Sequence, residues 1–334
     1  SNGMHLLGGR IEGSGGVGLV VTTTGPGFVS TSPVRVVGGA SYPAEMVVSA
    51  LPRIYPLPAD QDSLLGNARD TLRVTGGILQ SFAYPRQALP WHVTGDITVQ
   101  YYGILRPGPG ASFYFDPLVR LTATNGGRLV VHGTPAAPVV FTGSSWRGIT
   151  VDGTPSLGSY LTNVRIEHSL GVAALAGGSH TLVIDSAVFR QNGSAAWLWS
   201  ANSRISRSRV DSTWGASPAV LLTGYNSSIE STLIRASAGP GLGVTYSVQV
   251  LSCEVRDGAQ VGIMVWDASV EVNNCNLVNN GGVGISTDSP STVNVEGNWW
   301  GDAAGPTGPS GDGVGASLDY TPWRTTPYVL PYVP

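Results

Sequence analysis

The chain has 334 residues with a formal net charge of -3, 46 glycines and 23 prolines, and 42% of its residues are hydrophobic. That hydrophobic share can form a packed core, which excludes a disordered chain. All 18 basic residues are arginines and no run of 18 apolar residues occurs, so we expect neither a nucleic-acid partner nor a transmembrane helix.

Residues 1–93 are predicted to form N-terminal turns of a repeat structure that carry a long loop or insert. Residues 11–19 match residues 277–285 at every glycine after the turn. We therefore expect the chain to begin part-way along a stack, either as one module of a longer tandem protein or with a capped first turn. Two similar segments, 35–39 and 73–77, each predict a strand ending in Gly-Gly. Between them we expect a short helix over residues 62–68 or a long loop.

From residue 96 onward the sequence predicts short, evenly spaced strands over residues 97–99, 104–105, 113–115, 129–131, 139–141 and 149–151. Gly, Pro or Asn separates nearly every pair, as is typical of strands joined by turns. No stretch longer than about ten residues has a 3.6-residue apolar period, so we expect almost no helix.

Five motifs follow one another in order: GDITV at 95–99, LRPG at 105–108, GRLVVHGTPAAPVVFT at 127–142, WRGI at 146–149 and NWWG at 298–301. Together they resemble the secreted bacterial right-handed parallel β-helix proteins, the pectate-lyase-like superfamily, of the type that ends in Asn-Trp-Trp-Gly. The resemblance covers roughly residues 94 to 324 and implies a secreted or cell-surface protein. It assigns no activity, since that superfamily includes lyases, hydrolases, adhesins and modules without known function.

Residues 159–300 repeat at intervals of 21 to 24 residues, with apolar anchors at Ile166, Phe189, Val210, Ile234, Val255, Leu277 and Trp299. A period of that length built from short strands is typical of a solenoid. We predict an all-β, three-sided, right-handed parallel β-helix over residues 94–300, a C-terminal capping tail over 301–334, and one continuous structural domain. Equivalent side chains of successive turns then stack about 4.8 Å apart.

This stacking predicts three inward columns of side chains. The first holds Leu161, Ile184, Ile205, Ile229, Val250 and Val272, and the second holds the anchors from Ile166 to Leu277. The third holds Trp197, Val220, Val244, Ile263 and Ile285. A column of small residues precedes the second: Val164, Ala187, Ser208, Thr232, Cys253 and Cys275.

The two cysteines, Cys253 and Cys275, occupy neighbouring positions in the small-residue column. They are near enough for a disulfide if their Cβ directions permit, and otherwise form two buried free thiols. We expect no zinc site, because two cysteines without a nearby histidine cannot complete one.

One outward face is rich in arginine. Its two columns contain Arg165, Arg209 and Glu254, and Glu167, Arg190, Asp211, Arg235 and Arg256. Arginine pairs can bind carboxylates or sulfates of a polysaccharide, although nearly alternating charges favour an ion-pair ladder instead. For glycan cleavage the best candidates are Glu167 and Asp211, two turns apart, with Arg190 between them. The active-site strings of the resembled hydrolases and lyases are absent.

A second outward face is partly apolar. Ala174, Leu198, Leu221, Thr245, Met264 and Ser286 are expected to point outward there, with Trp266, Tyr225 and Trp214 nearby. Such a stripe is either a ligand-binding surface, suited to the apolar faces of sugar rings, or a surface covered by another segment of the chain. We take Leu198, Leu221, Met264 and Trp266 as candidate ligand-binding residues.

The capping tail carries candidate calcium ligands. Asp302, Asp312 and Asp319 could supply oxygens to Ca²⁺, but their spacing matches no defined loop and favours turn-forming aspartates. We expect no other cofactor. His168 is expected close to Glu167 and Arg190.

These features predict an extracellular or cell-surface structural or recognition module that presents stacked faces to a polysaccharide, a cell surface or further copies of itself. The alternative is a polysaccharide lyase or glycoside hydrolase that acts along the arginine-rich face. Unpaired carboxylates converging in a groove would favour the enzyme, and carboxylates paired between turns would favour the module.

Overall fold

The computed structural model describes residues 5–6, 9–22, 29–30, 34–50, 64–79, 82–84, 89–153, 158–267 and 269–331. Within these ranges the regular structure is almost entirely β; the helical residues are two short 3-10 segments, η1 (Val48–Ala50) and η3 (Gly305–Thr307), and the single residue Leu64. The expected near-absence of helix is thus confirmed for this part of the chain. Of the segment 62–68, residues 62 and 63 lie outside the described ranges, and residues 64–68 contain no α-helix.

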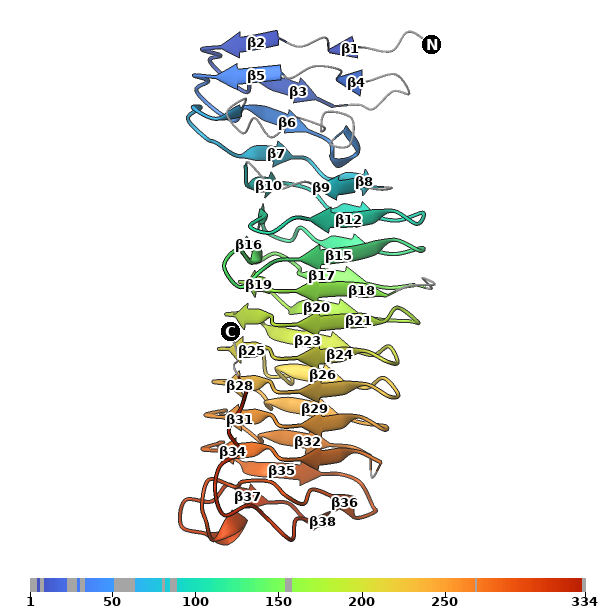
Figure 1. Ribbon diagram of the computed structural model, residues 1–334, viewed down its shortest axis with the longest axis vertical. Helices are drawn as coiled ribbons and strands as arrows, with labels where there is room; N and C mark the ends of the chain where they lie inside the picture. The colour runs from blue at the N-terminus through green and yellow to red at the C-terminus, as the bar shows by residue number, and fades with distance from the viewer. Residues whose placement is uncertain are drawn as a thin grey trace.

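The described strands form three long parallel sheets, one on each side of a coil (Figure 1). Sheet 1 has twelve strands: β3 (Leu19–Val21), β6 (Ala44–Met46), β7 (Leu72–Val74), β10 (Trp91–Val93), β13 (Ser112–Phe115), β16 (Val139–Gly143), β19 (Val164–Glu167), β22 (Val188–Arg190), β25 (Arg209–Asp211), β28 (Leu233–Arg235), β31 (Glu254–Arg256) and β34 (Asn276–Val278). Sheet 2 has eleven: β8 (Gly77–Leu79), β11 (Ile97–Val99), β14 (Leu121–Ala123), β17 (Ile149–Val151), β20 (Val172–Ala176), β23 (Ser194–Leu198), β26 (Val220–Leu222), β29 (Leu242–Val244), β32 (Ile263–Val265), β35 (Val283–Thr287) and β37 (Gly313–Val314).

Sheet 3 has nine strands: β9 (Phe82–Tyr84), β12 (Ile104–Pro107), β15 (Arg128–His132), β18 (Ser159–Thr162), β21 (Leu182–Asp185), β24 (Arg204–Ser206), β27 (Ser228–Glu230), β30 (Gln249–Leu251) and β33 (Glu271–Asn273). Three two-stranded pairs complete the topology: β1 (His5–Leu6) with β4 (Val29–Ser30), β2 (Gly9–Glu12) with β5 (Val34–Val37), and β36 (Val293–Asn294) with β38 (Leu318–Asp319). All six strands expected between residues 97 and 151 are present. From β7 to β33, each turn of the coil, called a rung below, contributes one strand to each of the three sheets.

The first two inward columns are confirmed by the strand registers. In sheet 1, Ile166 pairs with Phe189 and Ile234 pairs with Val255, and in sheet 3 Ile184 pairs with Ile205. These side chains are buried. Because consecutive strands stay in register, each column continues through every rung and forms one apolar core.

The predicted third inward column is wrong at Trp197. Trp197 points outward on sheet 2 and stacks on Leu221 of the next rung, whereas Leu198 is fully buried, as is Ala174. The inward positions of this sheet are Ala174, Ala196, Val220, Leu242, Ile263 and Ile285, and two residues later Ala176, Leu198, Leu222, Val244 and Val265. The Trp197 indole N–H donates to the carbonyl of Pro218, a partner that the apolar interior does not offer.

The sequence match between residues 11–19 and 277–285 does not place equivalent residues on the same sheet, because the two segments are displaced by one side of the coil. Residue 285 lies in sheet 2, whereas its sequence equivalent Leu19 starts β3 of sheet 1. Glycines after a strand occur at more than one corner of the coil, so this pattern alone does not identify the corner. The two Gly-Gly segments do follow strands, β5 and β7.

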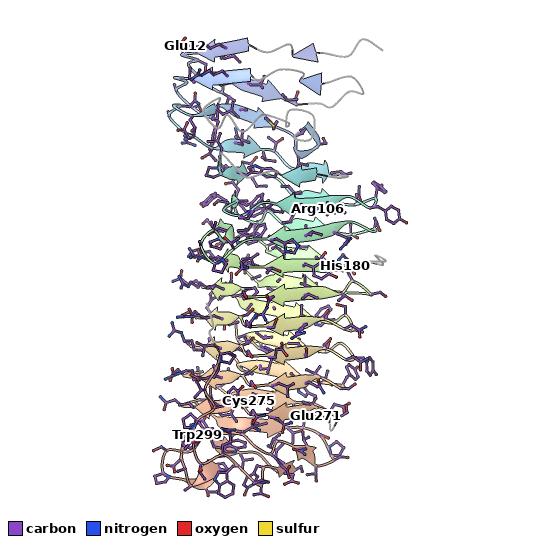
Figure 2. All side chains as sticks on the ribbon, in the orientation of Figure 1. Glu12, Arg106, His180, Glu271, Cys275 and Trp299 are labelled. Carbon is purple, nitrogen blue, oxygen red and sulfur yellow. The ribbon has the colours of Figure 1, made fainter. Side chains whose placement is uncertain are left out.

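The small-residue column makes hydrogen bonds between rungs. The Ser208 hydroxyl accepts from the Ala187 amide at 3.1 Å, and the Cys275 sulfur accepts from the Cys253 amide at 3.4 Å. Both cysteines are buried free thiols (Cys275 is labelled in Figure 2), and burial raises the pKa of the Cys253 thiol well above its ordinary value. The expected stacking of the cysteines is confirmed, without a disulfide.

Apolar and polar contacts close the C-terminal end. Trp300 is buried, and Tyr320 packs edge-on to it and stacks on Trp323. The tail then turns back along sheet 1, where the Asn276 side-chain amide exchanges two 2.8 Å hydrogen bonds with the backbone of Tyr328. These contacts cover the last rung, as an open solenoid end requires.

Candidate functional site

The outward face of sheet 1 carries one continuous column of polar and aromatic side chains. It runs through Arg73, His92, Tyr114, Thr142, Glu167, Arg190, Asp211, Arg235 and Arg256, one residue per rung. We call this series the outer column. The sequence-predicted order Glu167, Arg190, Asp211 is confirmed, with the two carboxylates two rungs apart.

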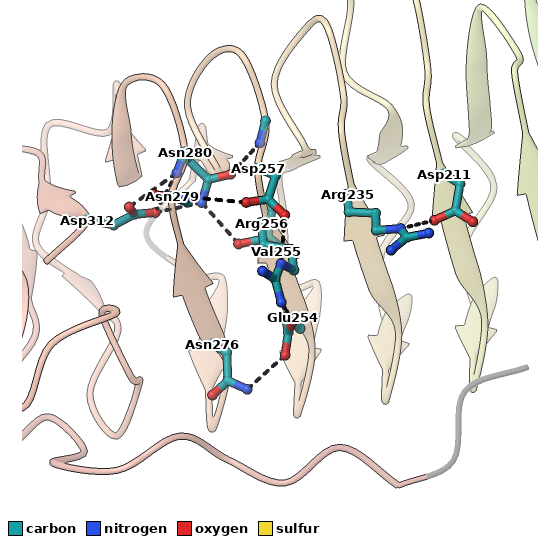
Figure 3. A network of polar contacts seen from close by, with 11 residues as sticks. Asp211, Arg235, Glu254, Val255, Arg256, Asp257, Asn276, Asn279, Asn280 and Asp312 are labelled. Atoms are coloured by element: carbon teal, nitrogen blue, oxygen red, sulfur yellow. Dashed lines mark hydrogen bonds and ion pairs between the residues drawn. The ribbon is translucent and has the colours of Figure 1, made fainter. Parts of the chain in front are cut away.

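Asp211 is the centre of an arginine cluster. Its side chain is 10% exposed, and its carboxylate accepts from Arg235 Nε at 2.5 Å and from Arg209 Nε at 2.7 Å. Arg190 Nε lies 3.7 Å away. Figure 3 shows the contact between Asp211 and Arg235 across adjacent rungs. One carboxylate therefore orients three guanidinium groups contributed by three successive strands.

The terminal nitrogens of these arginines remain free to bind a ligand. All three face Asp211 through Nε, and their Nη atoms donate no hydrogen bond to any residue in the described ranges. The hollow lined by the cluster contains three arginines and two carboxylates, Asp211 and Glu167, which gives it a net charge of about +1. A guanidinium presents parallel N–H donors to planar oxyanions. The cluster lines a hollow of about 430 Å³, together with Glu167, His168, Gln191 and Ser212.

The other charged residues of this face are already paired. Glu167 lies 3.6 Å from Arg165 Nε, and Arg256 donates to both Glu254 and Asp257 (Figure 3). The hydrogen bond from Arg256 lowers the pKa of Asp257 below its ordinary value, and the same bond raises the pKa of Arg256. The five predicted arginines thus divide into a central trio and two paired residues.

A second hollow of about 520 Å³ adjoins the first and shares His168 and Gln191 with it. His168 contacts Thr142 Oγ1 through Nδ1 at 3.2 Å and Gln191 Oε1 through Nε2 at 2.7 Å. Exposed apolar side chains, among them Tyr114 and Trp214, also line it. The two hollows form one groove along the edge of sheet 1.

Sequence reasoning missed a hydrogen-bonded chain at the N-terminal end of the outer column. Tyr42 Oη lies 2.6 Å from His92 Nδ1, and His92 Nε2 lies 2.7 Å from Asp116 Oδ1. Arg69 donates to the same Tyr42 oxygen at 2.7 Å. Because an ionised carboxylate only accepts, Nε2 carries a hydrogen; when the ring is neutral, Nδ1 is the acceptor and the Tyr42 hydroxyl donates to it. No spacing rule connects these residues, since they come from separate rungs.

A second missed contact joins Ser159 and His180 in the interior. His180 is fully buried and its Nε2 lies 2.7 Å from the Ser159 hydroxyl (His180 is labelled in Figure 2). Burial lowers the pKa of this histidine below its ordinary value. Ser159 Oγ also accepts from the Leu129 amide, so this pair lies inside the coil, away from the groove.

The apolar stripe on sheet 2 differs from the prediction in its first rungs, where Leu175 and Trp197 take the outward positions. Leu221 and Met264 point outward as expected, but the buried Leu198 and Ala174 do not belong to the stripe. Trp266 is partly covered because its indole lies over Gly243, where a Cβ atom would come within 2.7 Å of the ring. Glycine at position 243 therefore makes room for this indole on the sheet.

The predicted calcium ligands do not converge. Asp302 accepts from the amides of Ala304 and Ser310, and Asp312 accepts from the backbone and side chain of Asn280 (Figure 3). Asp319 belongs to β38. Burial raises the pKa of Asp312. Within the described ranges, no three His, Cys, Asp or Glu side chains are grouped so that they could hold a metal ion.

Comparisons with known proteins bear on the fold. A family model described as the right handed beta helix region matches residues 147–300. The fold is a right-handed parallel β-helix. No curated protein and no solved structure matches the chain. In the part of the chain that the structure describes, no helix has the length and apolar character needed to cross a bilayer.

Proposed function

We propose that this β-helix is an extracellular or cell-surface recognition module that binds an acidic glycan along the outer column of sheet 1. One observation carries the proposal. Asp211 accepts hydrogen bonds from Arg209 Nε and Arg235 Nε and lies 3.7 Å from Arg190 Nε, and the Nη groups of the three arginines have no hydrogen-bond partner in the described ranges. This arrangement supplies oriented donors for carboxylates or sulfates before any ligand arrives.

The geometry supports binding better than cleavage. Glycosidic hydrolysis needs two carboxyl groups that are free to act as acid and as base or nucleophile. Here Asp211 contacts three arginines and Glu167 is paired with Arg165. We therefore expect the protein to bind acidic glycans without cutting them.

The sequence resemblance to secreted β-helix proteins supports the proposed location outside the cell. An elongated coil with a repeated outer face also suits association with a cell surface or with further modules of the same kind. Since each rung adds one residue to the face, a polymeric ligand can contact several rungs at once.

Calorimetry with purified protein tests the proposal. The ligands are a polyuronate oligomer, a sulfated glycosaminoglycan oligomer and a neutral glucan of equal length. We expect binding of one or both acidic oligomers but not of the glucan, with affinity falling as salt rises. Product analysis of the same mixtures is expected to show intact chains.

Two variants give the matched comparison. Arg235→Gln removes one member of the trio and is expected to weaken acidic-glycan binding about tenfold, the usual cost of losing a charge-assisted pair of hydrogen bonds. Arg207→Gln is the control, because Arg207 pairs with Asp185 at the edge of sheet 3, away from the groove. Equal affinities of the two variants, or binding of the neutral glucan alone, would refute the proposal.

A further inference from the structure

The groove has two chemically different halves that meet at His168 and Gln191. The half around Asp211 contains the three arginines. The other half is lined by Tyr114, Thr142, Gly143, Ser144, Ser145, His168, Ser169, Leu170, Gln191 and Trp214, among which there is no carboxylate and no guanidinium. We propose that this second half is a subsite for an uncharged sugar ring, so that the ligand is a heteroglycan with acidic and uncharged rings next to each other.

The walls of the second half suit the apolar face of a sugar ring. Trp214 is 55% exposed, Tyr114 44% and Leu170 43%. These three large side chains come from different rungs yet surround one hollow of about 520 Å³, a volume within the usual range of small-molecule sites. Exposed aromatic planes around a concave surface gain stability when an apolar face displaces water from them.

The floor offers unused hydrogen-bonding atoms. Because the Gln191 carbonyl oxygen only accepts, His168 Nε2 donates to it; when the ring is neutral, His168 Nδ1 accepts from the Thr142 hydroxyl. This leaves the two N–H groups of the Gln191 amide and a lone pair on the Thr142 oxygen without a partner in the described ranges. They can bond the hydroxyl or acetamido groups that edge a sugar ring.

The absence of cations among the lining residues gives the subsite selectivity. A carboxylate placed against Tyr114 or against Trp214 would lose part of its water and would find no arginine among the residues that line this hollow, which is unfavourable. The arginine half overlaps the uncharged half along the coil, because Trp214 follows Asp211 on the same rung, and it extends one rung further to Arg235. This half has a net positive charge. A chain with a charge on every ring therefore fits one half only, whereas a chain that alternates fits both.

The inference rests on the proposed function, and calorimetry separates the two. The probes are a polygalacturonate oligomer, with a carboxylate on every ring, and a hyaluronan oligomer of equal length, in which glucuronate alternates with N-acetylglucosamine. We expect the alternating oligomer to bind about tenfold more tightly. Trp214→Ala should remove this preference and leave polygalacturonate binding nearly unchanged.

Two further variants complete the test. Trp199→Ala is the matched control, because Trp199 is 49% exposed and is not among the groove-lining residues; it should leave both affinities unchanged. Arg235→Gln should weaken both oligomers alike. Equal binding of the two oligomers, or an equal loss for both in Trp214→Ala, overturns the subsite while the acidic-glycan function stands. If neither oligomer binds, the proposed function fails and the subsite fails with it.

Discussion

Replacing Asn298 by alanine is expected to destabilise the C-terminal end of the coil. This asparagine is fully buried and belongs to the NWWG motif at 298–301. Its Oδ1 accepts from the Cys275 amide at 2.8 Å, and its Nδ2 donates to the carbonyls of Val272 and Val295 at 2.7 and 2.6 Å. One side chain thus provides hydrogen bonds to the last two rungs.

The magnitude follows from those three bonds. Alanine leaves one buried N–H without an acceptor, which costs about 1–3 kcal/mol, and removes a bond from two carbonyls at about 0.5–1.5 kcal/mol each. The expected loss is therefore about 2–6 kcal/mol, a large share of the stability of an ordinary domain. Urea unfolding followed by tryptophan fluorescence measures it, because Trp300 is buried at the same end.

Asn294→Ala provides the comparison. Asn294 is exposed and accepts one hydrogen bond from the Glu296 amide, which water can replace, so its loss should stay below about 1 kcal/mol. Hydrogen exchange of the Cys275 amide should accelerate in Asn298→Ala and remain unchanged in Asn294→Ala. A loss below about 1 kcal/mol for Asn298→Ala, equal to that of Asn294→Ala, would show that the buried asparagine does not hold the last rungs together.

Two further predictions concern the interior and sheet 2. Burial lowers the pKa of His180, so the unfolded chain takes up a proton below about pH 6.5 while the folded protein does not. The free energy of unfolding should therefore fall as the pH drops from about 6.5 to the pKa of His180 in the folded protein. In His180→Gln the free energy of unfolding should fall less over the same pH range. A flat pH dependence in the wild type would contradict this. Gly243→Ala places a Cβ atom 2.7 Å from the Trp266 ring and should lower the free energy of unfolding by about 1–3 kcal/mol, with a red-shifted tryptophan emission. Gly171→Ala is the control, because nothing lies within 4 Å of a Cβ atom at that position. Equal effects of the two substitutions would refute the packing argument.

The period of the repeat made most of the fold predictable. Anchors such as Ile166 and Val255 alternate with charged neighbours, so their inward direction is clear in the sequence. In the segment from Ala195 to Leu198 all four residues are apolar, and alternation no longer distinguishes the two faces. In the structure the size and polarity of the side chains distinguish the two faces. Ala196 and Leu198 point inside, and Trp197 points outside, where its indole N–H has an acceptor.

The charged half of the groove was predictable and the uncharged half was not. Arg190, Asp211 and Arg235 follow from counting along the repeat, because each lies one residue after an anchor. Trp214 and Leu170 lie in corner segments of unequal length, so counting does not place them together. The hydrogen-bonded series from Tyr42 through His92 to Asp116 spans the least regular part of the sequence, where no repeat period could be counted.

The in-register stacking has a consequence for how the surface can change. Each rung adds the same increment of length to the coil, about 4.8 Å, and contributes its own residue to the groove. Duplication or loss of one repeat would lengthen or shorten the groove by one step and leave the packing of the remaining rungs intact. The number of repeats therefore determines the length of the polymer segment that the groove can contact.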